Sequence, residues 1–221
     1  LEEVDQLHIT NNPLLTHVDH ASALRIATQI DIESNAVLED VDGLNGLESI
    51  DVLNIVQNNA LASIDLFNGE SLVTELTLLN ISQNGVTELD GFNALETVHS
   101  RLKIYQNPSL TDISGFDGLT LIDNVEGVEC EPMMDAECFP AAVIIEYNMG
   151  LMDISGFASL TRIKPSLTIN DNRTMPALTG FTALTEANDY IYIDSNEALE
   201  AVTGFTALTT VGRYLSFDDN G

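Results

Sequence analysis

Residues 102–122 read LKIYQNPSLTDISGFDGLTLI, and most of the chain can be aligned with this stretch as copies of one repeat. An asparagine follows a short apolar alternation, Leu102-x-Ile104, and the same arrangement returns at steps that are mostly 23 or 24 residues long. Alternation with period two over so few residues predicts a short β-strand before each asparagine. Self-similarity at this period indicates a solenoid, in which each coil buries its apolar residues against its neighbours. The repeated asparagines are Asn12, Asn35, Asn58, Asn84, Asn107, Asn148, Asn172, Asn196 and Asn220.

The repeated asparagine has a structural explanation. In stacked coils, equivalent side chains lie above one another at about the 4.8 Å spacing of β-strands. A carboxamide can then hydrogen-bond to the next carboxamide and to the backbone of the turn, and buried polar groups need such partners. We predict that the repeated asparagines form an internal ladder.

A second repeated feature follows later in most units, where glycine precedes phenylalanine or leucine. Glycine permits a tight bend, and we expect the aromatic rings that follow it to stack in a column. Together these features predict a mainly all-β solenoid of about nine coils, with residues 1–221 as a single domain. The expected column consists of Phe92, Phe116, Phe157, Phe181 and Phe205.

One long step interrupts the repeat. Asn107 and Asn148 are 41 residues apart, and the excess lies in residues 123–141, DNVEGVECEPMMDAECFPA, which form an insert loop. This polar insert carries the only two cysteines, Cys130 and Cys138. Two cysteines within one short insert loop predict a local disulfide. A disulfide in turn predicts an oxidising, extracytoplasmic compartment. A metal pair or a redox site is the alternative, but the insert lacks CxxC spacing and a nearby histidine.

The composition restricts the partners. Seven Lys and Arg against 35 Asp and Glu give a formal charge of -28, which repels phosphate and argues against binding to nucleic acid or anionic membranes. We expect no cofactor, and only non-specific association of divalent cations with the acidic surface. The sequence contains no run of about 18 apolar residues, which is the length that a membrane-spanning helix needs. We therefore expect no direct membrane insertion by this chain. We interpret the chain as a fragment of a longer protein, with any signal peptide or anchor outside it.

No constellation of catalytic residues stands out. The four histidines fall at unrelated repeat positions, and neither a GxSxG elbow nor a glycine-rich phosphate loop is present. His17, Asp19 and His20 in the first coil form an incomplete ligand set and favour surface histidines over a metal site. We therefore predict a protein that is not an enzyme and holds no metal. A polysaccharide-active β-helix enzyme is a minor alternative, which would need converging carboxylates or basic residues.

The alternation also predicts which side chains face outward from the strands. Exposed apolar and aromatic residues on a flat sheet are the features that attract a partner. Asn80, which opens an Asn-Ile-Ser glycosylation sequon, lies on the same face. The predicted binding residues are Val56, Tyr105, Ile144, Glu146, Tyr192 and Asp194.

The repeat resembles a known family. The pattern LxIxxNxxLxxIxGFxxLxxI, clearest in residues 104–113 (IYQNPSLTDI) and 193–202 (IDSNEALEAV), is similar to the receptor L-domain. This leucine-rich-repeat-like module occurs in the ectodomains of the insulin and epidermal growth factor receptors and in fungal and bacterial surface proteins. The resemblance implies a right-handed β-helix-like solenoid with short parallel strands, located outside the cell. The chain differs from the receptors in its regular coils, its many repeats and its lack of flanking cysteine-rich modules.

Three hypotheses for function follow. The first is a non-catalytic extracellular recognition or adhesion module that binds a protein or glycan through its main parallel sheet. The second is a structural subunit of a cell-surface layer or extracellular filament, formed by self-association. The third is the enzyme mentioned above. Binding would show as a saturable partner, whereas a structural role would show as self-assembly without a ligand.

The disulfide is open to a direct test. Mass spectrometry of a non-reduced digest should find Cys130 linked to Cys138, because closing so short a loop stabilises the excursion by about 2–3 kcal/mol in the chain-entropy model. The digest uses a protease that cleaves after glutamate, since Glu131 and Glu137 lie between the cysteines, and the same digest after reduction is the control and should release two separate peptides. Two free thiols in protein taken from its native compartment would contradict both the disulfide and the argument for secretion.

Overall fold

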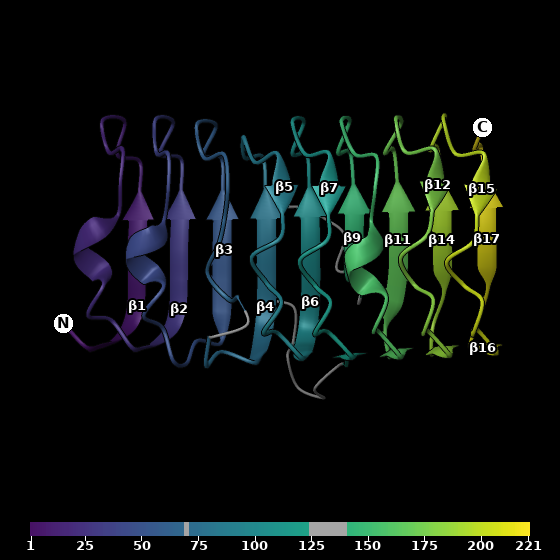
Figure 1. Ribbon diagram of the computed structural model, residues 1–221, viewed down its shortest axis with the longest axis horizontal. Helices are drawn as coiled ribbons and strands as arrows, with labels where there is room; N and C mark the ends of the chain where they lie inside the picture. The colour runs from purple at the N-terminus through teal and green to yellow at the C-terminus, as the bar shows by residue number, and fades with distance from the viewer. Residues whose placement is uncertain (69–70, 124–140) are drawn as a thin grey trace.

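The chain winds into a parallel β-solenoid, described here from a computed structural model (Figure 1). The structure describes residues 1–68, 71–123 and 141–221. The coils stack along the long axis of the molecule, with the two termini at opposite ends. The predicted all-β solenoid is therefore confirmed. The predicted Cys130–Cys138 disulfide lies outside the described residues, as does most of the insert.

The strands that carry the apolar alternation form one face of the solenoid, which we call the main sheet. They pair in parallel, and Leu53, Leu79, Leu102 and Val143 of consecutive coils are direct partners. In the described residues the main sheet contains β1 (Glu3–Thr10), β2 (Ile26–Glu33), β3 (Val52–Val56), β4 (Glu75–Ser82), β6 (Thr97–Tyr105), β9 (Ala141–Glu146), β11 (Ser166–Asn170), β14 (Ile191–Asp194) and β17 (Leu215–Asp218).

The long step in the sequence leaves this register intact. Leu102 of β6 pairs with Val143 of β9, and Tyr105 pairs with Glu146, so the coils on either side of residues 123–141 stack directly. The extra residues are therefore accommodated without shifting the side chains of the next strand to the opposite face, which a one-residue slip would do.

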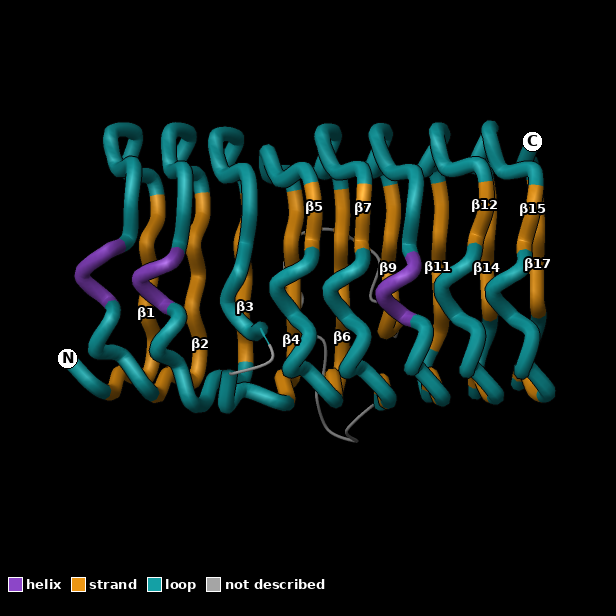
Figure 2. Tube along the Cα trace, in the orientation of Figure 1, coloured by secondary structure: helices purple, strands orange, loops and turns teal. Residues whose placement is uncertain are grey.

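Shorter strands lie on the other sides of the coils from β5 (Glu88–Leu89) onward, as the tube in Figure 2 shows. The first residues of β6 turn a corner, and Thr97 and Val98 pair with Leu121 and Ile122 of the next coil. This second ladder continues through β8 (Leu121–Ile122), β10 (Arg162–Ile163), β13 (Glu186–Ala187) and β16 (Thr210–Val211). Further pairs join β5 to β7 (Asp112–Ile113), and β12 (Ala177–Leu178) to β15 (Ala201–Val202). Short 3-10 turns occur at η1 (Asp19–Ala21), η2 (Asp42–Leu44) and η3 (Ser155–Phe157).

The phenylalanine column is present and runs one coil further than predicted. The rings from Phe92 to Phe205 stack at centroid distances between 5.0 and 5.6 Å. Phe67, which no glycine precedes, adds an edge-to-face contact to Phe92 at 5.9 Å. Gly180, before Phe181, permits close approach between coils, since a Cβ there would lie 1.7 Å from the carbonyl oxygen of Ile154.

The asparagine ladder is confirmed by its hydrogen bonds. The main-chain nitrogen of Asn35 donates to Oδ1 of Asn58 in the next coil at 3.1 Å, while Nδ2 of Asn35 donates to the carbonyl oxygen of Ile9 in the previous coil at 2.7 Å. One asparagine residue therefore joins three successive coils. The ladder asparagines with almost no exposed surface are Asn35, Asn58, Asn84, Asn107, Asn148, Asn172 and Asn196.

The residue before each ladder asparagine has a left-handed backbone, which the sequence did not predict. Its φ lies between 46° and 58° in every coil, although none of these residues is glycine. Such a conformation costs an L-residue roughly 1–2 kcal/mol. The ladder can offset this cost, since a buried hydrogen bond contributes about 1 kcal/mol net and each inner asparagine makes several. These corner residues are Asn11, Ser34, Gln57, Gln83, Gln106, Tyr147, Asp171, Ser195 and Asp219.

We expect Asn107→Ala to lower the free energy of unfolding by about 1–3 kcal/mol, because the main-chain nitrogen of Asn84 then loses its acceptor and the carbonyl oxygen of Ile81 loses its donor. Urea denaturation followed by circular dichroism measures this change. Asn12→Ala is the matched control at the solvent-exposed end of the ladder, and its effect should be clearly smaller. Equal effects at the two positions would contradict a ladder that works through burial.

Candidate binding surface

The outward face of the main sheet carries the side chains predicted to bind a partner. Strand pairing arranges them in two columns, as the alternation predicts. Ile144 and Tyr192 belong to one column, which runs through His8, Asp31, Asn54, Asn80, Lys103, Ile144, Thr168, Tyr192 and Ser216. The other four belong to the column Thr10, Glu33, Val56, Ser82, Tyr105, Glu146, Asn170, Asp194 and Asp218.

All six predicted residues are half-buried and lie on this face. Tyr105 and Tyr192 are three coils apart, with Ile144 and Glu146 in the coil next to Tyr105. Asp194 pairs directly with Asp218 beside Tyr192, which places negative charge at one end of the patch. The structure thus brings five of the six together over four consecutive coils, whereas Val56 lies two coils away from Tyr105.

Tyr105 belongs to an aromatic cluster that the alternation alone could not reveal. Its ring makes an edge-to-face contact with Tyr147 at 5.5 Å, and the Lys103 ammonium lies 4.5 Å from the centroid of the Tyr105 ring. Tyr147 is a corner residue with φ of 57°, so it falls outside the strand pattern. Its place directly before Asn148 is the signal that could have identified it. Negative charge at Asp171, followed by burial, raises the pKa of Tyr147 above its ordinary value of 10.0, so its hydroxyl stays protonated.

A second aromatic cluster lies near the C-terminal end of the sheet. The rings of Tyr190 and Tyr214 stack in parallel with centroids 5.0 Å apart, and Tyr192 lies two residues beyond Tyr190. Burial, followed by the charge of Asp194, raises the pKa of Tyr192 above 10.0. The chain contains five tyrosines, and none is in the buried core. Five phenylalanines, in contrast, are completely buried: Phe67, Phe92, Phe116, Phe157 and Phe181.

The N-terminal half of this face is polar, and many of its polar side chains form hydrogen bonds with one another. Asp31, only 7% exposed, accepts hydrogen bonds from Nε2 of Gln29 and from Nδ2 of Asn54, both at 2.8 Å. Nδ1 of His8 lies 2.7 Å from the same carboxylate. Asn80 faces outward, as the sequence predicts, and its Oδ1 accepts a hydrogen bond from Ser82. These groups form a network that stabilises the sheet.

Histidines bridge successive coils through carboxylates. His17 binds Asp40 at 2.5 Å, which agrees with the prediction of a surface histidine, and His99 contacts Asp123 at 3.0 Å and Glu75 at 3.2 Å. The hydrogen bond to Asp40 raises the pKa of His17 above 6.5. Burial lowers the pKa of His99, but the hydrogen bonds and charges of its two carboxylates outweigh this effect and leave the pKa raised. Within the described ranges, no group of three or more His, Cys, Asp or Glu side chains is arranged to hold a metal ion.

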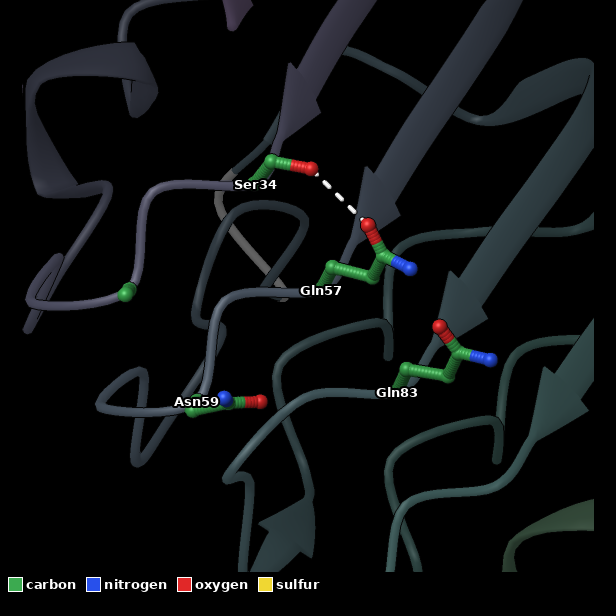
Figure 3. A pocket seen from close by; sticks show the side chains of 5 residues that line it. Ser34, Gln57, Asn59 and Gln83 are labelled. Atoms are coloured by element: carbon green, nitrogen blue, oxygen red, sulfur yellow. Dashed lines mark hydrogen bonds between the residues drawn. The ribbon is translucent and has the colours of Figure 1, made fainter. Parts of the chain in front are cut away.

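A shallow hollow of about 400 Å³ lies at the corner beside the ladder (Figure 3). Oγ of Ser34 donates to Oε1 of Gln57 at 2.8 Å, and Nε2 of Gln83 donates to Oε1 of Gln106 at 2.7 Å. The sequence analysis did not identify this hollow, because its walls come from corner residues of three coils. It is lined by Ser34, Ala36, Gln57, Asn59 and Gln83.

Comparison of the chain with protein-family models, curated proteins and solved structures finds no match. Among the residues that the structure describes, no helix is long and apolar enough to cross a membrane. Any assignment of function must therefore be argued from the surface itself.

The pKa of His99 leads to a pH prediction. Because the folded-state pKa is raised, the contribution of His99 to the free energy of unfolding is fully present below about pH 6.5 and is lost as the pH rises through the folded-state pKa. We expect His99→Gln to destabilise the protein by roughly 0.5–1 kcal/mol near pH 5.5 and by less near pH 8.5.

Urea denaturation of both proteins at each pH measures this difference, and the comparison with wild type cancels the titration of the other carboxylates. A gap between wild type and variant that stays constant or widens toward high pH would contradict the proposed role of the Asp123 and Glu75 contacts.

Proposed function

We propose that the protein is a non-catalytic extracellular recognition or adhesion module that binds a protein or glycan through the outward face of its main sheet. The observation that carries this proposal is the placement of the aromatic residues. Tyr105 and Tyr192 lie on this face. Tyr105 contacts Tyr147, and Tyr192 lies two residues after Tyr190, which stacks on Tyr214, while phenylalanine and aliphatic residues fill the interior.

Tyrosine suits a recognition surface for physical reasons. Its ring offers a large contact area with little conformational entropy to lose, and its hydroxyl forms directed hydrogen bonds. The pKa values of Tyr147 and Tyr192 are raised above 10.0 by nearby carboxylates and by burial, so both hydroxyls carry their protons at neutral pH, as unperturbed tyrosines also do. The parallel strands and the buried ladder lie beneath the surface tyrosines and hold them in place. This lowers the entropic cost of ordering the surface on binding.

An extracellular location is supported by three features of the sequence. The resemblance to receptor L-domains places similar modules on cell surfaces. The predicted Cys130–Cys138 disulfide requires an oxidising compartment. The charge of -28 favours solubility and disfavours phosphate-rich partners.

The contacts of the histidines support a role without catalysis. His8, His17 and His99 each bind a carboxylate of a neighbouring coil. Their geometry fits pairs that stabilise the stacking of coils.

Self-association is a second candidate, favoured by the last coil. Tyr214, Leu215 and Phe217 are between 45% and 49% exposed, and β17 presents an open strand edge. Such an edge can pair with another strand, from a second copy or from a further coil. At the other end, β1 presents the complementary open edge of the same parallel sheet.

The double substitution Tyr105→Ser and Tyr192→Ser tests the recognition surface. On arrays of extracellular proteins and glycans, it should weaken a saturable interaction of the wild type by about 100-fold or more, because buried tyrosine anchors contribute about 2 kcal/mol each. The melting temperature should stay nearly unchanged, since both side chains point away from the core.

Tyr105→Phe with Tyr192→Phe is the matched control, which keeps the rings and should retain part of the affinity. Binding that survives the serine substitutions would exclude this surface as the site. Concentration-dependent assembly without any ligand, measured by light scattering, would instead favour the structural alternative.

A further inference from the structure

The corner residues before the ladder asparagines form a continuous polar row along the solenoid axis. Ser34, Gln57, Gln83 and Gln106 contribute one side chain per coil, and Tyr147 follows in the next coil. Their left-handed backbone places all of them at the same corner, at the edge of the main sheet. Four strand spacings separate the first from the last, which corresponds to roughly 19 Å.

Two hydrogen bonds join neighbouring glutamine and serine members of the row. Ser34 bonds to Gln57, and Gln83 bonds to Gln106, but no hydrogen bond joins Gln57 to Gln83 in the part of the chain that the structure describes. Figure 3 shows the amide nitrogen of Gln57 on the side of Gln83, and the amide oxygen of Gln83 on the side of Gln57. A donor and an acceptor thus face a gap that a group able both to accept and to donate would bridge.

The opposite wall of the hollow offers a further carboxamide. Asn59 follows a ladder asparagine directly, and its side chain makes no hydrogen bond within the described residues. Ala36, the equivalent residue one coil earlier, is small and leaves space beside Ser34. Because both walls are attached to buried ladder residues, Asn35 and Asn58, they are held in place before any ligand binds.

The lining is uncharged, although the chain as a whole is strongly acidic. None of the five lining residues carries a charge, and the nearest residue in sequence that does is Glu33, beside Ser34. Carboxamides and hydroxyls in this setting match a ligand rich in hydroxyl groups, which donate and accept at the same atom. The surrounding negative charge disfavours sulfated or uronic acid ligands.

The aromatic cluster lies further along the same row. Tyr147 succeeds Gln106 at the corner, and its ring contacts Tyr105. A tyrosine ring next to a polar groove offers a flat apolar surface on which the apolar face of a sugar ring can pack. Hydrogen-bonding and stacking groups therefore occur in one line, at spacings comparable to the length of a linked sugar unit.

We propose that this corner row, from Ser34 through Gln57, Asn59, Gln83 and Gln106 to Tyr147, binds a neutral oligosaccharide aligned with the solenoid axis. The inference rests on the proposed recognition function and names one ligand class for it. A hydroxyl of the sugar bridges the amide nitrogen of Gln57 and the amide oxygen of Gln83, and a second sugar unit packs on the tyrosine cluster.

Isothermal titration calorimetry with defined hexasaccharides tests the proposal. The neutral probes are cellohexaose, laminarihexaose, mannohexaose and chitohexaose, and the anionic control is hexagalacturonate. We expect saturable binding of at least one neutral hexasaccharide and none of hexagalacturonate. Equal binding of the anionic sugar would overturn the charge argument on which the ligand class depends.

Variants then locate the site. Gln57→Ala combined with Gln83→Ala should weaken binding of the neutral hexasaccharide at least tenfold, and Asn59→Ala should weaken it severalfold. Asn188→Ala, which removes an exposed carboxamide at a distant corner, is the matched control and should leave binding unchanged. Thermal melts confirm that each variant is folded, and binding that survives the double substitution would overturn the site.

The results that would exclude the oligosaccharide site differ from the results that would exclude recognition by the main sheet. If no neutral hexasaccharide binds, the oligosaccharide site is excluded, while a protein partner lost on substituting Tyr105 and Tyr192 would still support recognition by the main sheet. If a neutral hexasaccharide binds and is lost with the tyrosines but not with the glutamines, the ligand class holds and the corner position is wrong.

Discussion

The hydrogen bond from one ladder asparagine to the next is the interaction on which the rest of the structure depends. Each coil turns sharply at a residue with left-handed backbone, and that turn is unfavourable for the serine, glutamine, aspartate and tyrosine residues found there. The following asparagine compensates by joining the main chain of its own coil to the coils before and after it. Because the same bonds recur in every coil, the corner keeps one geometry over the length of the molecule, and the main-sheet strands stay in register even across the long step from Asn107 to Asn148.

This regularity separates the interior from the surface. Inward positions hold aliphatic residues and a phenylalanine column, and these positions are completely buried in the middle coils. Outward positions are free to vary, because they contribute little to the core, and they range from the Asp31 network to the tyrosine clusters. A rigid support with a variable outer face is well suited to recognition, since side chains on fixed strands lose little freedom when a partner binds.

The corner row shows how the ladder also shapes a potential site. A ladder asparagine must be flanked by two residues that leave the core, one before it and one after it. Stacking turns these flanking residues into two parallel rows, and the hollow lies between them at Gln57, Asn59 and Gln83. Such a groove is a consequence of coil stacking and requires no separate loop.

The sequence by itself determined the solenoid, the ladder, most of the phenylalanine column and the two outward columns of the main sheet. These features follow from the repeat length and from alternation within a single coil, so local patterns are sufficient to predict them. Only the tertiary structure decided the left-handed corners, the addition of Phe67 to the column, the contact of Tyr147 with Tyr105, the histidine–carboxylate pairs and the polar hollow. Each of these depends on which atoms of neighbouring coils meet. Those contacts join residues that are 23 or more positions apart, and the side-chain directions that create them are set by the stacking of coils rather than by any pattern within one.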